Sequence, residues 1–306
     1  MVALDPRSAK LRLRRVGRLR GKPRRCGRMI SGRTRLLALI GQPVGHSLSP
    51  RMHNASFEAD GLDYVYVSLD VDPGNLAAAV EGMAALKLRG FNITMPHKRA
   101  MVGLVDELDE GACVSGAVNT VVIDEGSGLR GYNTDGGGMM EACREAGIEV
   151  SGRRVLLLGA GGAAASIAVA LGGEGAGEVR VVNRNTERAE ELLGKLGAAG
   201  VEGVQVYPAD ALNEAAADAD VIVNVTPLGM KDGDPLPIPE EYLREGMAVC
   251  DAVYRPGRET PLVRQARERG ARVVAGERML LYQGVLAQRL WTGREPNVRA
   301  MSEAIS

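Results

Sequence analysis

The chain has 306 residues, of which 45% are hydrophobic, so it exceeds one usual domain and can bury two cores. No apolar run approaches the ~20 residues that a membrane-spanning helix needs, which excludes an integral membrane protein of that kind. The 40 glycines follow no collagen-like period and predict many tight turns in a fold that alternates strands and helices.

The 38 basic and 38 acidic residues cancel overall but are unevenly placed. Residues 1–35 hold 13 Lys and Arg and a single acid, Asp5, which leaves 25 basic and 37 acidic residues elsewhere. Such an arm is typical of a nucleic-acid tether or a targeting peptide. Apolar periodicity begins only at Leu36, however. We therefore favour Met29 as the true start, predict that residues 1–28 are disordered, and expect no nucleic-acid partner.

The possible metal-binding and disulfide-forming residues are scattered. The cysteines are Cys26, Cys113, Cys143 and Cys250, and the histidines are His46, His53 and His97. Their spacing matches neither a zinc site nor a disulfide framework. We expect no metal and no membrane partner, and a reducing cytoplasm is the compartment that this cysteine usage favours.

The first half reads as one α/β unit. Alternation predicts strands at residues 36–40, 64–69, 89–93 and 117–123. Helices are expected to begin at Ser49-Pro50, with Ser49 as N-cap, at Asp72-Pro73, and after Thr94-Met95-Pro96. These helices lie between strands, as in a parallel sheet with right-handed crossovers.

A second unit follows with the same rhythm. It begins with a helix over residues 135–146. Strands are predicted at 154–158, 179–182, 204–207, 221–224, 248–252 and 272–274, with helices between most of them. The last helix, over 279–290, follows this unit, so residues 271–276 are predicted to be a hinge that returns the chain to the first unit.

A glycine turn follows the first strand of the second unit. It reads Gly159-Ala160-Gly161-Gly162-Ala163-Ala164 and differs from G-x-G-x-x-G only in its last residue. Gly159 permits the tight turn, and Gly161 lets backbone N–H groups approach a pyrophosphate at a helix N-terminus. The pattern predicts a dinucleotide site.

The end of the next strand indicates which dinucleotide binds. It reads Asn183-Arg184-Asn185-Thr186-Glu187-Arg188, with no acid at the tip to hold a ribose hydroxyl as in NAD sites. Arg184 and Arg188 suit a 2′-phosphate. Both could instead be solvated residues at a helix start, but a helix N-terminus disfavours cations unless an anion is nearby. The sequence favours NADP over NAD.

Polar residues that could perform chemistry gather at strand ends of the first unit. Asn92, Thr94 and Lys98 follow one strand, Asn119 belongs to another, and Asp135 opens the next helix. Active sites of such sheets collect at strand ends. Lys98 and Asp135 could form an acid/base couple, and the amides and hydroxyls could hold a polyhydroxylated ligand.

Seven elements in order resemble the shikimate dehydrogenase (shikimate/quinate dehydrogenase) family over about residues 36–290. They are Gly45-His46-Ser47-Leu48-Ser49-Pro50, Asn92-Ile93-Thr94-Met95-Pro96-His97-Lys98, Ala117-Val118-Asn119-Thr120, Tyr132-Asn133-Thr134-Asp135-Gly136, Asn224-Val225-Thr226-Pro227-Leu228-Gly229-Met230, Asp251-Ala252-Val253-Tyr254 and Met279-Leu280-Leu281-Tyr282-Gln283-Gly284. The resemblance implies two α/β domains that flank a cleft: a substrate domain over 29–134 plus 277–306, and a Rossmann-type NADP domain over 135–276.

The resemblance also implies roles for single residues. Lys98 and Asp135 are the catalytic pair. The substrate contacts are Ser47, Ser49, Asn92, Thr94, Lys98, Asn119, Asp135, Tyr254 and Gln283. The cofactor contacts are Gly159, Ala160, Gly161, Gly162, Ala163, Asn183, Arg184, Asn185, Thr186, Glu187, Arg188, Thr226, Ala252, Gly276 and Met279, with Glu110 at the border of the site. Asn185 stands where the family usually has Thr, so that one contact is open, and the adjacent Thr186 could replace it.

The activity that the resemblance implies is reversible NADPH-dependent reduction of 3-dehydroshikimate to shikimate in the chorismate pathway of aromatic amino acid biosynthesis. Ketone reduction needs a proton on oxygen, and a free lysine with a pKa of about 10.4 is an ammonium at neutral pH that can donate one. Two alternatives stay open: a quinate or quinate/shikimate dehydrogenase, and a non-catalytic cofactor- or metabolite-binding paralogue, which would be expected to lack Lys98 or Asp135. The chain is expected to be a monomer or a homodimer.

Overall fold

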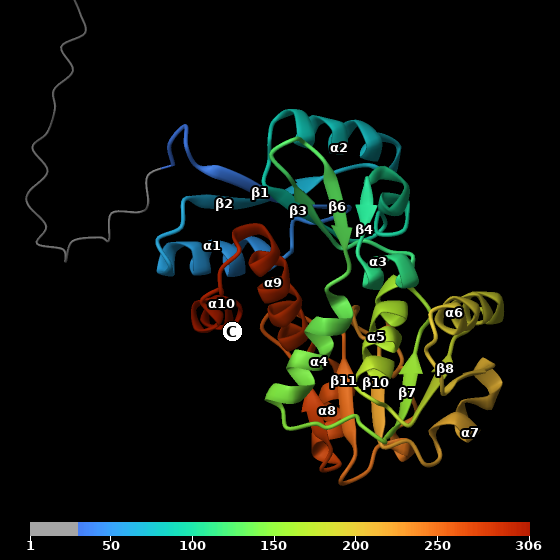
Figure 1. Cartoon of the computed structure of the whole chain (residues 1–306). Helices are drawn as coiled ribbons and strands as arrows, with labels where there is room; N and C mark the ends of the chain where they lie inside the picture. Colours follow the sequence, from blue (N-terminus) through green and yellow to red (C-terminus); the bar gives the residue numbers. More distant parts are fainter. Residues whose placement is uncertain (1–29) are drawn as a thin grey trace, which may run out of the picture.

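The computed structural model describes residues 30–306, which fold around two separate sheets (Figure 1). The expectations for residues 1–28, and the residue Cys26, lie outside the described residues. The upper body in Figure 1 is built from the first part of the chain and the last two helices. The lower body is built from the middle part.

The first sheet contains six strands in the order β2-β1-β3-β5-β6-β4. Their bounds are β1 Arg35–Gly41, β2 Tyr64–Asp70, β3 Gly90–Ile93, β4 Glu107–Leu108, β5 Thr120–Ile123 and β6 Leu129–Tyr132. Strands β2, β1 and β3 are parallel, whereas β5 runs antiparallel to both β3 and β6. The prediction of a parallel sheet is therefore confirmed for β2, β1 and β3 and is wrong for β5, which is antiparallel to both of its neighbours. A short turn joins β5 to β6, and two strands so joined must be antiparallel.

The helices of this half are α1 Ser49–Ala59, α2 Leu76–Ala85 and α3 Glu110–Ser115, with a 3₁₀ turn at Pro73–Asn75. The helix expected directly after Pro96 is absent. Its place is taken by turns and a short 3₁₀ helix at Ala100–Leu104. That segment contains Val102 and Gly103, both poor helix formers.

The start of α1 differs from the prediction in one respect. Pro50 lies in the first turn as expected, but the cap position is Leu48, and it makes no side-chain capping bond. Ser49 is instead the first helical residue. Its backbone N–H donates to Oγ of Ser47 at 3.2 Å, so Ser47 forms the local turn before the helix.

The second sheet has the order β12-β11-β10-β7-β8-β9, and all its neighbouring strands are parallel. Its strands are β7 Arg154–Leu158, β8 Glu178–Val182, β9 Val204–Tyr207, β10 Val221–Asn224, β11 Ala248–Asp251 and β12 Arg272–Val274. In chain order this is the 3-2-1-4-5-6 arrangement of the Rossmann fold. The six strands predicted for this unit are confirmed.

Alternate residues of β7 pack into two different hydrophobic cores, one on each face of the sheet. Val155 and Leu157 belong to one buried cluster, and Leu156 and Leu158 to the cluster on the other face. A strand buried on both faces reads as a continuous apolar run. Helices cover these faces: α5 Gly162–Gly173, α6 Thr186–Ala198, α7 Leu212–Ala216 and α8 Pro261–Glu268, with 3₁₀ turns at Ala209–Ala211 and Glu240–Tyr242.

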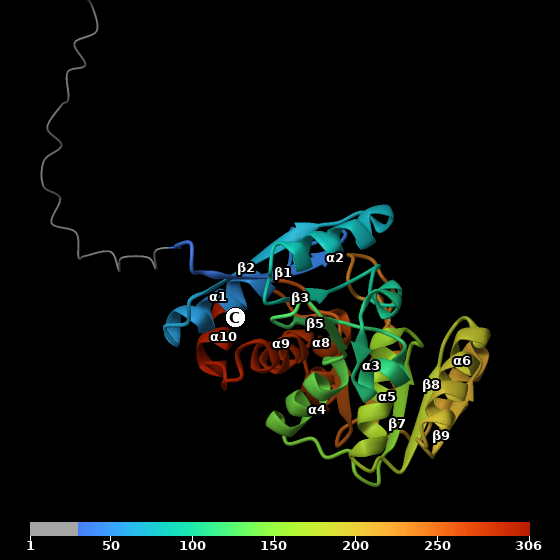
Figure 2. The same ribbon diagram turned by 45° about the horizontal axis from the view of Figure 1, so that its top comes forward.

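Two helices lie where the halves meet, α4 Asp135–Glu145 and α9 Gly276–Thr292 (Figure 1). They pack so closely that a Cβ added to Gly138 of α4 would lie 2.6 Å from the backbone N of Gln283 on α9. The helix α9 was predicted at 279–290 and is longer at both ends. The final helix, α10 Val298–Ile305, was not predicted, and it lies beside α1 from the other end of the described chain in Figures 1 and 2.

Candidate active site

The ends of β3 and β5 bring the polar side chains of the first half together. Because the two strands are antiparallel, the carboxyl end of β3 lies beside the amino end of β5. The backbone N–H of Ile93 donates to the carbonyl of Asn119 at 2.8 Å. This contact places Asn92 next to Asn119 and Thr120, although 27 or more residues separate them in the chain.

Lys98 and Asp135 form an ion pair. Nζ of Lys98 lies 2.7 Å from Oδ2 of Asp135, 37 residues along the chain. The Asp135 side chain is only 5% exposed, whereas that of Lys98 is 22% exposed. Within residues 30–306, Asp135 is the one partner of this ammonium. Two of its three N–H bonds therefore remain available for a ligand oxygen.

Asp135 is held in place by its neighbours. Oδ1 of Asp135 accepts from Nδ2 of Asn119 at 2.7 Å, and its backbone N–H donates to Oδ1 of Asn133 at 3.1 Å. The second Nδ2 hydrogen of Asn119 goes to Oγ1 of Thr134 at 3.0 Å. Since both N–H bonds of Asn119 are used inside the protein, this amide orients the carboxylate, and a ligand hydroxyl would have to replace one of these partners.

A hydrogen-bonded chain continues from this cluster toward α1. Nδ2 of Asn92 donates to Oγ1 of Thr120 at 2.9 Å, and Oδ1 of Asn92 accepts from the Tyr66 hydroxyl at 2.7 Å. Tyr66 in turn is hydrogen-bonded to Ser49, and burial raises the pKa of Tyr66 well above its usual value. The structure thus connects Ser49, Asn92, Asn119, Asp135 and Lys98.

Sequence reasoning missed Tyr66 and Thr120. Tyr66 lies in the middle of β2 and is buried, and a tyrosine hydroxyl in a core needs a polar partner. This requirement is the only signal in the sequence that could have identified Tyr66. Thr120 belongs to an element that was recognised, but its link to Asn92 depends on the antiparallel pairing of β5, which was not predicted.

Tyr254 and Ser47 meet although they come from different halves. The Tyr254 hydroxyl is hydrogen-bonded to the Ser47 side chain and to the Leu48 backbone, while burial raises the pKa of Tyr254. Tyr254 follows β11 of the second sheet, and Ser47 precedes α1 of the first. This contact brings the end of the second sheet to Ser47, one of the two serines predicted to contact the substrate.

Two predicted substrate residues lie outside this hydrogen-bonded cluster. Nε2 of Gln283 donates to the carbonyl of Leu280 within α9 at 2.8 Å. Thr94 lies against Gly41, where an added Cβ would come within 2.3 Å of the Thr94 methyl group. Neither side chain hydrogen-bonds to Lys98 or Asp135 in the described structure.

The glycine turn has the geometry expected for a phosphate site. Gly159 has φ of +117°, and Gly161 is the extended cap of α5. The first N–H groups of a helix have no partner inside the helix, so those of α5 face the turn. A Cβ on Gly162 would lie 2.6 Å from Cβ of Ala117. The turn therefore contacts the segment that leads into Asn119.

Arg184 and Arg188 are exposed, and neither forms an ion pair with any residue of the part of the chain that the structure describes. Asn185 between them is the N-cap of α6, because its Oδ1 accepts from the Arg188 backbone N–H at 2.8 Å. The Asn that replaces the family's usual Thr is thus a strong capping residue. Two unpaired guanidinium groups beside a helix N-terminus fit a 2′-phosphate.

The remaining predicted cofactor residues lie at the ends of β10 and β11. Oγ1 of Thr226 donates to Oδ1 of Asn224 at 2.7 Å, and the Ala252 N–H donates to the Asn224 carbonyl at 2.8 Å. Gly276 is the first residue of α9, and a Cβ added to it would lie 2.3 Å from the Val253 carbonyl oxygen. Met279 is buried in the core of the second half. Glu110, at the start of α3, is exposed.

Asp251 is a fully buried carboxyl group at the end of β11. Burial raises its pKa to about 6, against the opposing hydrogen bonds from Thr260, Val253 and Asn224. An unfolded Asp has a pKa of about 3.9. Because the folded state binds this proton more tightly, the stabilising contribution is complete below about pH 3.9 and is lost as the pH rises through about 6.

We expect Asp251→Asn to remove this pH dependence. The free energy of unfolding of the wild type, relative to that of the variant, should fall by about 3 kcal/mol between about pH 4 and pH 7. Urea titrations of both proteins at several pH values measure this difference, and other titrating groups cancel in it. Two stability curves that stay parallel over this range would contradict the assignment.

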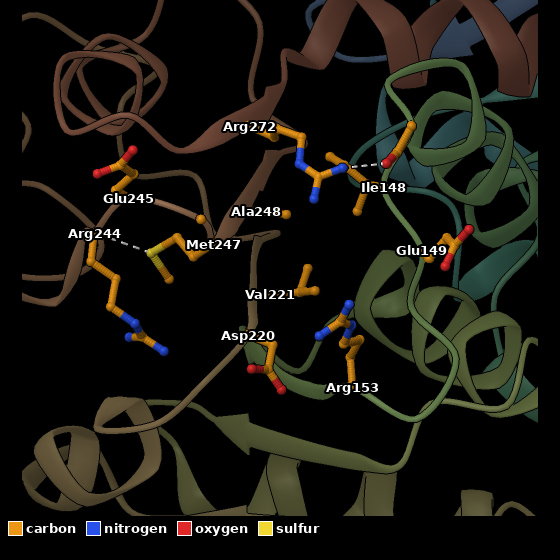
Figure 3. Close-up of a pocket in the computed structure, with 12 residues that line it drawn as sticks. Ile148, Glu149, Arg153, Asp220, Val221, Arg244, Glu245, Met247, Ala248 and Arg272 are labelled. Atoms are coloured by element: carbon orange, nitrogen blue, oxygen red, sulfur yellow. Dashed lines mark hydrogen bonds between the residues drawn. The ribbon is translucent and has the colours of Figure 1, made fainter.

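A cavity of about 450 Å³ lies at the opposite edge of the second sheet (Figure 3). Its lining includes Val221, Ala248 and Arg272, which begin β10, β11 and β12, together with Arg153 and Asp220. The glycine turn and the ion pair lie at the other ends of the strands. Binding sites of parallel sheets form at the carboxyl ends, so this cavity is not the active site.

Residues 30–306 contain no group of three or more His, Cys, Asp or Glu side chains that could hold a metal ion. Nor does this part of the chain contain a helix that is long and apolar enough to cross a membrane.

Comparison with protein families gives three matches along the chain. Residues 39–121 match a shikimate dehydrogenase substrate binding domain, residues 141–228 match a shikimate / quinate 5-dehydrogenase, and residues 276–305 match a shikimate 5′-dehydrogenase C-terminal domain. The first match contains Lys98 and Asn119, the second contains the glycine turn, and the third contains Gln283.

Individual proteins match nearly end to end. The chain is 60% identical over 277 residues to a shikimate dehydrogenase (NADP(+)) of Rubrobacter xylanophilus, covering 90% of this chain and 97% of the relative. A crystal structure of a shikimate dehydrogenase in complex with NADP+ matches with a TM-score of 0.85, 40% identity and coverage of 92% and 97%. A quinate dehydrogenase from Corynebacterium glutamicum in complex with NAD matches with a TM-score of 0.82, 36% identity and coverage of 89% and 98%.

Proposed function

This chain belongs to the shikimate dehydrogenase family, and from that membership we propose that it reduces 3-dehydroshikimate to shikimate with NADPH, reversibly, in the pathway that leads to aromatic amino acids. It is an oxidoreductase whose cofactor is NADP(H). The second sheet has the Rossmann strand order, and its glycine turn and unpaired arginines fit this dinucleotide.

The two halves have different roles, one in binding the substrate and the other in binding the cofactor. Residues 29–134 with 277–306 form the substrate domain, and residues 135–276 form the NADP domain. The contact of Gly162 with Ala117 and that of Tyr254 with Ser47 support this arrangement, because each joins a cofactor-side segment to a substrate-side segment. The glycine turn with Arg184 and Arg188 would hold NADP(H), which would supply the hydride for the substrate carbon.

Lys98 then provides the proton for the substrate oxygen. Its ammonium is partly exposed, has two N–H bonds available and is fixed by Asp135, so it can donate to an oxygen that gains negative charge as hydride arrives. Asn119 donates a hydrogen bond to Oδ1 of Asp135 and so orients the carboxylate whose Oδ2 pairs with Lys98. In oxidation the same lysine, once neutral, accepts the proton of the substrate hydroxyl.

The other polar residues bind the substrate. Ser47 and Ser49 suit its carboxylate, and they reach the site together with Tyr254 and Tyr66. Asn92, Thr94, Asn119, Asp135 and Gln283 would hold the ring hydroxyls. The single observation that carries the proposal is the ion pair between Lys98 and Asp135, whose N–O distance is 2.7 Å. The Asn119 amide donates to Asp135, and the Asn92 amide donates to the Asn119 carbonyl at the strand ends.

A quinate dehydrogenase is the second candidate, since the quinate dehydrogenase that matches this chain was solved with NAD. The strand-end sequence separates the two, because Arg184 and Arg188 take the place where an NAD site has an acid. Shikimate and quinate differ in their rings, and NADP+ differs from NAD+ by one phosphate. Both differences can be measured in a single set of assays.

The proposal is tested by steady-state kinetics with shikimate and with quinate, each with NADP+ and with NAD+. We expect kcat/KM to be highest for shikimate with NADP+, by about 100-fold over either pairing that includes NAD+. Preference for quinate with NAD+ would reverse the ranking. Absence of turnover in all four pairings, with NADP+ still bound, would instead favour a non-catalytic paralogue.

We also propose that the enzyme acts in the cytoplasm as a monomer or a homodimer. The free cysteines of the described chain and the reduced cofactor suit a reducing compartment.

A further inference from the structure

Cys143 and Cys250 meet in the core of the second half. Their sulfur atoms lie 3.6 Å apart although 107 residues separate them in the chain. Cys143 is on α4 and is 2% exposed, whereas Cys250 is on β11 and is 0% exposed. Both thiols are free. Sequence spacing gave no sign of this pair, because the fold alone brings α4 onto β11.

A small cavity borders one of the two cysteines. It has a volume of about 160 Å³ and is lined by Met140, Cys143, Arg144, Ile148, Val150 and Glu174 among others. A water molecule takes up about 30 Å³ of liquid, so hydrogen peroxide, which is only slightly larger, fits this space. Cys250 does not line the cavity. Of the two cysteines, Cys143 is therefore the one beside the space that a small oxidant could enter.

The surroundings make the two thiols unequal. The hydrogen bond from the Cys250 thiol lowers the pKa of Cys143, and the charge of Arg144 lowers it further, although burial opposes both. The contact with Cys143 and complete burial raise the pKa of Cys250. The thiolate, which is the nucleophile in thiol oxidation, thus forms more readily on Cys143 than on Cys250.

We propose that hydrogen peroxide oxidises Cys143 and Cys250 to a reversible disulfide. The Cys143 thiolate attacks one peroxide oxygen and the O–O bond breaks. The second oxygen leaves as hydroxide and is protonated to water, and Cys143 becomes a sulfenic acid. The Cys250 sulfur then attacks the sulfenic sulfur, the S–O bond breaks, and water leaves with the thiol proton. The two thiols lose two electrons, and the peroxide is reduced to two waters.

This cross-link acts on the catalytic region. The sulfurs must approach from 3.6 Å to the bonding distance of about 2.05 Å. Helix α4, which carries Cys143, begins with Asp135, and its Gly138 packs on the backbone of Gln283 with no room for a Cβ. A displacement of α4 therefore shifts Asp135 or Gln283. Displacements on the order of 1 Å in an active site can cost about 100-fold in rate.

The test compares the full-length protein with three variants after exposure to hydrogen peroxide. Cys26→Ser/Cys113→Ser removes the other two thiols, while Cys143→Ala and Cys250→Ala each break the pair. Peptide mass spectrometry should find a Cys143–Cys250 cross-link in the wild type and in the double variant. Turnover of both should fall about tenfold or more and recover with dithiothreitol. In Cys250→Ala, a sulfenic acid should be trapped on Cys143 with dimedone, and Cys143→Ala should keep its turnover.

Two results would overturn the proposal. The first is oxidation of Cys113 in the wild type while Cys143 and Cys250 stay reduced, which would mean that the cavity does not admit the oxidant. The second is full cross-linking without any change in turnover, which would mean that the bond does not reach the active site. The mass-spectrometric readout does not depend on the substrate, so it remains valid if the proposed activity is wrong.

Discussion

Lys98→Ala is expected to lower kcat by roughly 1,000-fold and to leave KM for shikimate within a few-fold of the wild type. The lysine donates or accepts the proton that moves with the hydride, so its loss affects the transition state more than the bound ground state. Substrate contacts from Ser47, Asn92 and the neighbouring hydroxyls persist in the variant. Steady-state rates followed through the nicotinamide absorbance measure both constants.

The control for this variant is Lys195→Ala. Lys195 is on α6, and its one ion pair within residues 30–306 is an exposed contact with Glu191 one turn away, of a kind that contributes little to stability. Its removal should leave both constants unchanged. Asp135→Asn gives a second test, because the neutral side chain keeps its size but no longer grips the ammonium, and we expect kcat to fall by about 100-fold. A Lys98→Ala enzyme with wild-type kcat would disprove the acid/base assignment.

Arg184→Ala/Arg188→Ala is expected to raise KM for NADP+ by roughly 100-fold and to leave KM for NAD+ nearly unchanged. Hydrogen bonds between charged groups contribute about 1.5–3 kcal/mol each, and only NADP+ carries the 2′-phosphate that these guanidinium groups would hold. Neither arginine forms an ion pair with a described residue, so the substitution disrupts no salt bridge of the fold.

Arg153→Ala is the matched control. Arg153 is also exposed and also lacks an ion pair within residues 30–306, but it lies at the opposite edge of the same sheet, beside the cavity in Figure 3. Both cofactor constants should stay at the wild-type value in this variant. An equal loss of NADP+ and NAD+ affinity in the double variant would show that the arginines support the fold of the site and do not select the phosphate.

The second half of the molecule was the easier to predict. Its strands are buried on both faces, so β7 and β10 appear as continuous apolar runs. The N-cap positions of α5, α6 and α8 are a glycine or a capping residue. The parallel order follows from the alternation of strands and helices. Only the ends of elements, such as the longer α9, were outside the reach of periodicity.

The first half was harder because local patterns there do not determine pairing. Strand β6 is only four residues long and contains Gly131 and Arg130, so its pattern is weak. Without β6 the β5–β6 hairpin was not predicted, nor was the antiparallel pairing of β5 with β3 that sets Thr120 beside Asn92. The residue types at the site were predicted, whereas the hydrogen bonds that order them, above all those of Tyr66 and Asn119, depend on tertiary contacts between distant segments.

The cysteines illustrate the same limit. Spacing alone gave no reason to pair Cys143 with Cys250, and their contact depends on how α4 lies against the second sheet. Ser47 was predicted only as a substrate contact, but its hydroxyl also accepts from the Ser49 N–H in the turn before α1. A side chain that serves a turn and a ligand together cannot be recognised from residue type.

The central claim is that Lys98 exchanges the proton in both directions of the reaction. Its most direct test is the pH dependence of single-turnover rates with the wild type, from about pH 6 to about pH 10, for the reduction of 3-dehydroshikimate and the oxidation of shikimate. We expect oxidation to speed up as the pH rises, because the lysine must be neutral to accept a proton, and reduction to slow down over the same range. Rates that are independent of pH in both directions, with both ligands bound, would contradict the claim.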